Sequence, residues 1–319
     1  MASRFTGGGE VISMLHFVIN ERAGNGQGAK KWQRVKEQLS VPYKVHITQY
    51  EKHAIELVHT LCNEAKLGDE KTVIIVVGGD GSIHEALNGF DWGSTVMLGA
   101  VSAGSGNDFN RGYGSFKTAR EIERFLQDGK STTHDLGLIE AGNQTISFVN
   151  NCGIGFDATV AITANESKTK KRFNKLGLGK LSYAFYLVKC LFTFKPFDLI
   201  VTTEGGERTF ENVWFVTASN QPFFGGGMKI SPSSKTNDGQ LELTVVHNLS
   251  RLKLLFVFST VFFGKHTGFK EIEQLTASSF KLMMHETYLF HADGEKLLID
   301  TASAPIICKV QPNYWKLAK

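Results

Sequence analysis

The chain has 319 residues, which at roughly 100–200 residues per domain predicts two domains. Hydrophobic residues make up 42% and charged residues 21%, a composition that excludes a disordered chain. The net charge of +4 is too small to indicate a nucleic-acid partner, although it is compatible with an anionic membrane surface. None of the four cysteines has Cys-x-x-Cys spacing, so neither a zinc site nor a disulfide framework is predicted.

The first residues, Met1–Ser13, are Gly-rich and have no apolar signal core. We interpret them as the remnant of an expression tag and leave them out of the predicted fold. No apolar run reaches the ~18 residues that span a bilayer. The apolar runs Leu181–Phe194, which Lys189 interrupts, and Leu254–Phe263 are therefore predicted to be buried or interfacial helices.

Strands and helices alternate over the first half of the chain. The predicted strands are Leu15–Ile19, Lys44–Thr48, Thr72–Val77 and Val96–Val101, and the predicted helices are Ala29–Leu39, His53–Lys66, Ser82–Asn88 and Thr118–Gln127. The continuous β-branched run Thr72–Val77 is typical of a strand that is buried on both faces. This alternation predicts a parallel sheet with right-handed crossovers.

Beyond about residue 131, short strand-like runs follow one another through turns. The strand candidates are Leu136–Glu140, Thr145–Asn150, Phe197–Thr203, Thr209–Val216, Leu241–Val246, Phe280–Met284, Tyr288–Ala292 and Lys296–Asp300, and the helix candidates are Ala158–Asn165, Lys180–Thr193 and Arg251–Phe263. Such spacing predicts an antiparallel β domain, and a sandwich in particular.

The strongest candidate site follows the strand Thr72–Val77. It consists of Gly78, Gly79, Asp80, Gly81 and Ser82. Glycines let the backbone approach a phosphate, and the N-terminus of the helix that follows directs N–H donors at the anion. A carboxylate at such a place makes sense when a divalent cation or a substrate hydroxyl is also present. The structural alternative is a tight turn with a capping Asp, which would not require three glycines.

Two more Gly-rich loops follow predicted strands of the same half. One contains Gly104, Ser105, Gly106, Asn107 and Asp108, and the other contains Asn20, Gly24, Gly26 and Gly28. Because ligands bind at the carboxyl ends of parallel strands, these loops could share one nucleotide. Asn107 could bind a base or ribose, although capping of a helix by Asn107 or Asp108 is the alternative. No Gly-Lys-Ser/Thr follows the loop that begins at Asn20, so this loop is not a Walker loop.

The second half carries two further motifs. One runs from Ser219–Gln221 through Gly225–Gly227 to Asp238, and the other is His291-Ala292-Asp293-Gly294-Glu295. Kinases use an Asp to accept the proton of the substrate hydroxyl, and Asp293 with Glu295 offers two carboxylates for this role. The alternatives are an ordinary Asp-Gly hairpin turn and a half-buried strand histidine.

These motifs occur in a family's order, and from Met14 onward the sequence resembles the bacterial diacylglycerol kinase-like lipid kinases, relatives of sphingosine and ceramide kinases. The motifs that carry the resemblance are Asn20–Gly28, Gly78–Ser82, Gly104–Asp108, Asp135, Gly225–Asp238 and Asp293–Glu295. A Gly-Gly-Asp-Gly loop by itself would also fit NAD kinases. The sequence departs from the family pattern at Glu21, where Pro is usual.

The resemblance implies an α/β nucleotide domain like those of phosphofructokinase and NAD kinase at residues 14–133, joined again by residues 302–319. It implies an antiparallel β-sandwich for the lipid substrate at residues 134–301. ATP and Mg²⁺ are the implied cofactors, with Asp80 near the phosphates and Asp293 as general base beside Glu295. Nucleotide contacts are expected from Asn20, Gly24, Gly26, Gly78, Gly79, Asp80, Gly81, Ser82, Gly104, Ser105 and Asn107, and a charged network around magnesium from Asp108, Asp135 and Asp238.

We therefore expect an ATP- and Mg-dependent lipid kinase that acts on diacylglycerol or a similar lipid, cytoplasmic and peripherally membrane-associated. A run of basic residues precedes Leu181–Phe194, and we interpret it either as a contact with anionic lipids or as a solvated loop. Its members are Lys168, Lys170, Lys171, Arg172, Lys175 and Lys180. A cluster of phenylalanines lines an acyl pocket or packs in the core: Phe256, Phe258, Phe262 and Phe263. No nucleic-acid partner is expected, and the oligomeric state, a homodimer included, stays open.

Two other functions compete with this interpretation. A soluble-metabolite kinase of the NAD kinase type would use the same loop at Gly78–Gly81, but the Gly104–Asp108 loop and the Asp293-Gly-Glu motif fit the lipid kinases better. A non-catalytic lipid-binding or regulatory module would have lost Asp80 or Asp293, and both are present.

Overall fold

The structure is a computed structural model that describes residues 12–67, 71–91, 93–166, 179–300 and 304–319. The chain forms two compact units, and each is assembled from separate stretches. Unit 1 combines Met1–Leu136, Thr236–Gly239 and Gln311–Lys319, and unit 2 combines Gly137–Lys235 and Gln240–Val310.

Unit 1 is built on a parallel sheet. Its strand order is β2 (Lys44–Ile47), β1 (Ile12–Ile19), β3 (Lys71–Gly78), β4 (Met97–Ser102) and β17 (Ile306–Ala318). Seven of the eight residues of β3 are buried, because this strand lies in the middle of the sheet and both its faces are covered. The predicted parallel α/β fold of the first half is therefore confirmed.

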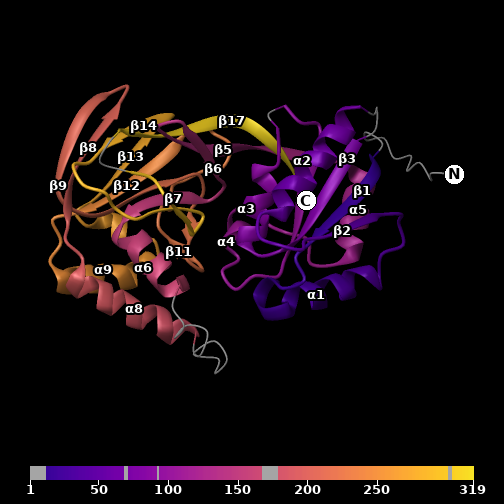
Figure 1. The fold of residues 1–319 in the computed structure, drawn as a ribbon, viewed down its shortest axis with the longest axis horizontal. Helices are drawn as coiled ribbons and strands as arrows, with labels where there is room; N and C mark the ends of the chain where they lie inside the picture. The colour runs from indigo at the N-terminus through magenta and orange to yellow at the C-terminus, as the bar shows by residue number, and fades with distance from the viewer. Residues whose placement is uncertain (1–11, 68–70, 92, 167–178, 301–303) are drawn as a thin grey trace. The chain divides into compact units, whose positions relative to one another are not determined.

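Helices cover both faces of this sheet (Figure 1). They are α1 (Ala23–Lys36), α2 (His53–Lys66), α3 (Asp80–Asn88), α4 (Asp108–Gly112) and α5 (Ala119–Asp128). Trp32 of α1 and Phe125 of α5 share one apolar core with Phe17 and Ile75 of the sheet. The Oγ1 atom of Thr118 caps α5 by accepting a hydrogen bond from the N–H of Glu121.

The start of the fold differs from the prediction. Strand β1 begins at Ile12, whose register partner is Lys71, so leaving Ile12 and Ser13 out of the fold was wrong. The preceding residues 1–11 lie outside the described residues. The first helix follows a Gly-rich turn as predicted, because Gly24–Gly26 within the bounds of α1 has positive φ and the regular helix begins only beyond it, but the helix ends at Lys36 and not at Leu39.

Unit 2 is an antiparallel β domain. Its main strand order is β16 (Glu295–Leu297), β15 (Phe290–Ala292), β7 (Asn151–Gly155), β9 (Gly206–Ser219), β8 (Phe197–Thr203) and β14 (Ser279–Met283), which pairs with β17. Strand β12 (Leu241–His247) pairs with β9 and with β13 (Ile272–Ala277), and β5 (Ser131–Ala141) pairs with β6 (Gln144–Phe148). Phe148, Leu199, Leu243 and Phe280 meet in its core, each 0% exposed.

The α-helices of unit 2 in the described part of the chain are α6 (Phe156–Glu166), α8 (Gly179–Thr193) and α9 (Arg251–Val261). Their apolar residues, including Leu191 and Leu254, form a second core around Trp214. The predicted β-sandwich and its helices are confirmed. One predicted strand, Thr145–Asn150, is in fact shorter, because the chain bends between β6 and β7 before continuing as β7. That bend matters for the site in unit 2.

Candidate functional site

In unit 1, the loop that follows β1 is bonded to the loop that follows β3. The Nδ2 atom of Asn20 donates to the Oγ of Ser82 over 2.9 Å, and the N–H of Asn20 donates to the carbonyl of Val77. Because β1 and β3 are parallel neighbours, both loops leave the sheet at the same edge. The structure thus brings these two sequence-predicted loops together.

The loop that follows β4 closes against the same place. The N–H of Ala103 donates to the carbonyl of Gly78 over 2.7 Å. Only glycine fits at Gly24, where φ is +56° and a Cβ would lie 2.0 Å from the carbonyl oxygen of Ala103. A Cβ on Gly104 would lie 2.8 Å from the Cα of Gly79, so the backbones of the loops that follow β3 and β4 are in contact. Gly24, Gly79 and Gly104 therefore allow close packing of the three loops.

Two carboxylates lie in this cluster of loops. A Cβ on Gly106 would meet the Oδ2 atom of Asp80 at 2.7 Å and the Oδ2 atom of Asp108 at 3.8 Å, so both acids flank the same glycine. The Oδ1 atom of Asp80 accepts from the N–H of Phe109 over 3.0 Å. Asp108 is 7% exposed and forms an ion pair of 3.0 Å with Arg111. Asp80 is also the first residue of α3, where backbone N–H groups favour an anion.

The loop that follows β4 also contains a buried hydrogen-bond acceptor. The Oδ1 atom of Asn107 is buried and accepts no hydrogen bond from the residues that the structure describes. A buried acceptor without a donor is costly, and this acceptor is compatible with the expected contact between Asn107 and a nucleotide. Ser105, in contrast, is exposed, and Ser82 is 8% exposed.

Asp135 has a structural role that the sequence did not reveal. It is 1% exposed, and its two carboxylate oxygens accept from the backbone N–H groups of Gly239 and Asn313, each over 2.8 Å. Its own N–H donates to the carbonyl of Thr236 over 2.8 Å. Asp135 therefore joins β5 by hydrogen bonds to the segment Thr236–Gly239 and to Asn313 of β17.

Asp238 is exposed and lies next to Gly239. Among the described residues, no group of three or more His, Cys, Asp or Glu side chains could hold a metal ion. Asp108, Asp135 and Asp238 thus do not form a metal-binding group by themselves, because backbone donors occupy both oxygens of Asp135. Their expected place around magnesium stays a prediction.

The site in unit 2 centres on a tight turn between β15 and β16. Asp293 and Gly294 form its two central residues with φ of +50° and +88°, as in a type I′ hairpin. The Asp293 carboxylate accepts from the backbone N–H groups of Val149, Asn150 and Asn151 over 2.8, 2.8 and 3.1 Å. Such bonds favour the ionised carboxylate, which is the form that can accept a proton. Both interpretations of Asp293, turn residue and candidate base, are thus compatible.

The bend that binds Asp293 is itself held by buried amides. Asn151, Asn220 and Gln221 are each 0% exposed. The Nε2 atom of Gln221 donates to the Oδ1 of Asn150 over 3.0 Å, and the Nδ2 of Asn151 donates to the carbonyl of Phe223 over 3.1 Å. The motif Ser219–Gln221 that the sequence singled out therefore shapes the backbone around Asp293. Glu295, the second carboxylate of the motif, is exposed.

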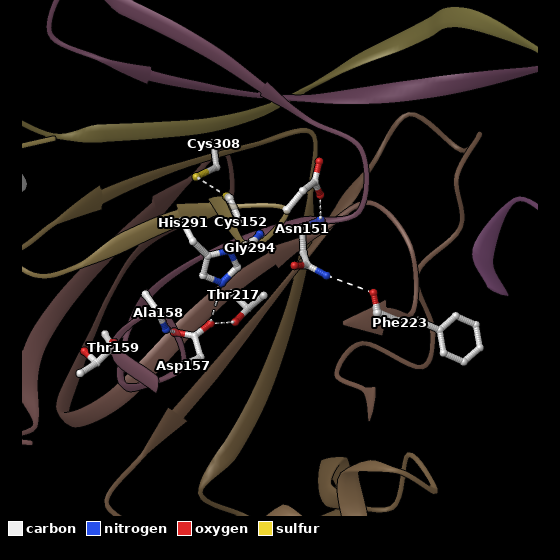
Figure 2. Close-up of polar contacts among 12 residues, drawn as sticks. Asn151, Cys152, Asp157, Ala158, Thr159, Thr217, Phe223, His291, Gly294 and Cys308 are labelled. Atoms are coloured by element: carbon white, nitrogen blue, oxygen red, sulfur yellow. Dashed lines mark hydrogen bonds and ion pairs between the residues drawn. The ribbon is translucent and has the colours of Figure 1, made fainter. Parts of the chain in front are cut away.

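A buried Asp–His pair lies under the same turn, and the sequence did not single out its carboxylate (Figure 2). The Nε2 atom of His291 lies 3.3 Å from the Oδ2 of Asp157, and the Nδ1 of His291 accepts from the N–H of Gly294 over 3.2 Å. Thr217 donates its hydroxyl to the same carboxylate oxygen over 3.0 Å. His291 is 0% exposed, and its ring stacks on Phe224 at 4.8 Å between ring centroids. His291 is thus fully buried, and the alternative prediction of a half-buried strand histidine is wrong.

Unit 2 also contains an apolar cavity of about 50 Å³. Its lining includes Leu187 of α8, Leu254 and Phe258 of α9, and Asp157. Of the four phenylalanines predicted to line an acyl pocket or pack in the core, only Phe258 lines this cavity. The other three are exposed, Phe256 by 62%, Phe262 by 47% and Phe263 by 75%. Core packing is therefore wrong for these three.

The basic run cannot be placed in the same way. Five of its members lie outside the described residues, namely Lys168, Lys170, Lys171, Arg172 and Lys175. Lys180 lies in the first turn of α8. No helix in the described part of the chain combines the length and the apolar character that crossing a membrane requires.

Comparison with known families assigns both halves of the sequence. The family described as "Diacylglycerol kinase catalytic domain" matches residues 14–139, and the family described as "YegS C-terminal NAD kinase beta sandwich-like domain" matches residues 150–319. The chain is 33% identical over 291 residues to "Putative lipid kinase YtlR" of Bacillus subtilis, covering 89% of this chain and 94% of that protein.

More distant relatives carry related names. The chain is 29% identical over 209 residues to a diacylglycerol kinase of Mycobacterium tuberculosis, covering 65% of each chain. Its fold is similar to the crystal structure of a "putative diacylglycerol kinase" from Bacillus anthracis, with a TM-score of 0.72, 19% identity and coverage of 96% of this chain and 94% of that one.

Proposed function

Because the chain belongs to the diacylglycerol kinase-like lipid kinases, and is thus a phosphotransferase that acts on an alcohol group, we propose that ATP and Mg²⁺ serve the reaction and that diacylglycerol or a similar lipid accepts the phosphoryl group. The observation that carries this proposal is the meeting of three Gly-rich loops around Asp80 at the strand ends of unit 1. Glycine backbone and a helix N-terminus together suit the polyphosphate of a nucleotide.

Magnesium fits the residues present when the nucleotide supplies part of its coordination. Mg²⁺ usually binds one or two carboxylates together with phosphate oxygens and water, and does not need an all-protein cage. Asp80 and Asp108, which both flank Gly106, are the residues that would hold it. The ion would neutralise charge on the transferring phosphoryl group. Asn107 would donate or accept hydrogen bonds at the base or ribose.

Asp293 is proposed to take the proton from the lipid hydroxyl. Its carboxylate is anchored by three backbone N–H groups, and these bonds hold it ionised in a fixed direction. A fixed, ionised acceptor suits general-base catalysis because little reorganisation is needed when the proton moves.

The lipid class is supported by the surface of unit 2. The cavity beside α8 and α9 is lined almost wholly by apolar side chains, as a hydrocarbon chain requires. It is too small for a whole acyl chain, so the helices would have to move apart on binding. Phe256 and Phe263 are exposed on or beside α9, and exposed aromatic residues of this kind suit a membrane surface. We propose that the protein works peripherally at a membrane.

The test is phosphorylation of 1,2-dioleoylglycerol in detergent micelles with radiolabelled ATP, with and without Mg²⁺. We expect labelled lipid, a loss of about 10²–10⁴-fold in kcat for Asp293→Asn, and no measurable turnover for Asp80→Asn. Asp198→Asn is the matched control, because Asp198 is an exposed carboxylate that accepts one bond from the N–H of Asn212. Phosphorylation of NAD in place of lipid would reject the proposal.

A further inference from the structure

We infer that Asp157 and His291 are positioning residues for Asp293, because they hold the Asp293 turn through a hydrogen-bond chain that ends at the N–H of Gly294. The inference rests on the function proposed above, in which Asp293 accepts the substrate proton. It assigns a role to a buried pair of unit 2.

The chain of bonds fixes where the ring proton of His291 lies. A backbone N–H can only donate, so the Nδ1 atom, which faces the N–H of Gly294 at 3.2 Å, must be an acceptor. The single proton of the neutral ring then sits on Nε2, which faces the Oδ2 atom of Asp157 at 3.3 Å. Asp157 therefore selects the tautomer that can bind Gly294, as carboxylates do for many functional histidines.

The pair is rigid because of what surrounds it. The carboxylate of Asp157 accepts from the N–H of Ala158 at Oδ1 and from the hydroxyl of Thr217 at Oδ2. The ring of His291 is parallel to that of Phe224 within 3°. Gly153 lies under both side chains, and a Cβ there would lie 2.1 Å from Asp157 Oδ2 and 2.7 Å from His291 Nε2.

The bond to Gly294 acts on Asp293 because the two residues share a peptide group. The carboxylate of Asp293 is held on one side by the bend at residues 149–151, and the peptide that follows Asp293 is held on the other side by His291. Asp293 also has the left-handed conformation, with φ of +50°, that a type I′ turn requires at this position. Loss of the Gly294 bond would let the turn, and with it the carboxylate, move.

Asp157→Asn keeps the shape of the side chain but removes one of the acceptors on which this chain of hydrogen bonds depends. If the new amide nitrogen faces the ring, the Nε2 atom of His291 must accept, and the ring proton moves to Nδ1. That proton then opposes the N–H of Gly294, and the bond is lost. If the amide is flipped, its nitrogen opposes the N–H of Ala158 instead. Either orientation leaves two donors facing each other.

Two variants of His291 separate the bond to Gly294 from packing. His291→Phe keeps a flat ring against Phe224 and removes both bonds. His291→Asn keeps an oxygen close to the place of Nδ1, so the N–H of Gly294 still has an acceptor, but it does not reach Asp157. We expect kcat to fall about 10–100-fold in Asp157→Asn and His291→Phe and less in His291→Asn, with KM for ATP unchanged in all three.

A double-mutant cycle distinguishes positioning from a general loss of stability. In the Asp293→Asn background, His291→Phe should lower kcat by less than threefold, because the residue that it positions is already disabled. His16→Phe is the matched control, since His16 is a buried histidine of unit 1 at 3% exposure, and its ring is hydrogen-bonded to that of His46. We expect it to leave kcat unchanged. A full, multiplicative loss on adding His291→Phe to Asp293→Asn would overturn the inference.

A readout that needs no activity completes the test. Long-range ¹H–¹⁵N spectra of protein labelled with ¹⁵N-histidine, with the signal assigned by its absence in His291→Phe, should show the proton on Nε2 in the wild type. A wild-type proton on Nδ1 would overturn the inference. If Asp293→Asn keeps full turnover, the function proposed above fails, whereas the spectra still support or overturn the hydrogen-bond chain.

Discussion

Asp135→Asn is the substitution that best tests how unit 1 is held together. The carboxylate is buried and accepts one backbone N–H at each oxygen, from Gly239 at Oδ2 and from Asn313 at Oδ1. Asparagine has nearly the same shape but only one acceptor oxygen. Its amide nitrogen must face one of the two backbone donors, so one bond is lost and two donors oppose each other.

The cost follows from these two effects. A hydrogen bond to a charged group contributes about 1.5–3 kcal/mol, and a buried donor left without an acceptor costs about 1–3 kcal/mol. Because the two effects overlap, we expect the unfolding free energy of unit 1 to fall by about 3 kcal/mol. For a unit of this size, that corresponds to a decrease of roughly 10 °C in the melting temperature.

Thermal unfolding and amide hydrogen exchange measure this prediction. Exchange should accelerate in peptides that contain Gly239 and Asn313, and it should do so equally with Mg²⁺ and with a chelator. Asp198→Asn, which alters one exposed bond, should change the melting temperature by less than about 2 °C. A loss seen only when Mg²⁺ is present would refute the structural role and would identify Asp135 as a metal ligand.

Three further outcomes are expected. Burial, with smaller contributions from neighbouring positive charges, lowers the pKa of His16 to about 4, below its ordinary value of 6.5. The unfolded chain therefore binds more protons between these values, so the unfolding free energy should fall as the pH drops from about 6.5 to about 4, and urea midpoints should show a flatter profile in His16→Phe. Gly106→Ala places a Cβ 2.7 Å from a carboxylate oxygen of Asp80, and its kcat should fall at least about tenfold in the micelle assay. The double substitution Phe256→Ser and Phe263→Ser should weaken sedimentation with phosphatidylglycerol vesicles at least about tenfold.

Each of the last two predictions has a matched control. Gly268→Ala adds a Cβ that meets no atom within 4 Å, and it should leave kcat unchanged. Leu67→Ser removes an apolar side chain of unit 1 that is 92% exposed, and it should leave vesicle binding unchanged. Equal losses in test and control variants would mean that contact with Asp80, or with the exposed phenylalanines, is not the cause.

The parallel sheet of unit 1 could be predicted because its signals are local. The run Thr72–Val77 is too continuously apolar for a strand with one solvent-exposed face, and in the structure it forms the buried centre of β3. The meeting of the loops at Asn20, Gly79 and Gly104 followed from the same prediction, since neighbouring parallel strands end at one edge. The reason for Gly24, Gly79 and Gly104, a backbone contact between loops, required the structure.

Other parts of the site left no local signal. Asp157 and His291 lie 134 positions apart; the sequence singled out His291, but Asp157 is only an Asp at the start of an apolar helix. The segment Thr236–Gly239 belongs to unit 1 because backbone N–H groups bind Asp135, and backbone bonds leave no trace in composition or periodicity. The three backbone donors to Asp293 were invisible for the same reason.

The segment Thr236–Gly239 and the final residues also constrain how such a protein can change by recombination. The chain leaves or re-enters unit 1 after residues 136, 235, 239 and 310. A gene fragment that ended near residue 136 would lack β17, the parallel neighbour of β4, and the backbone N–H groups that bind Asp135. A single crossover within the gene therefore cannot exchange one complete unit for that of another protein, and the two units have to be inherited together.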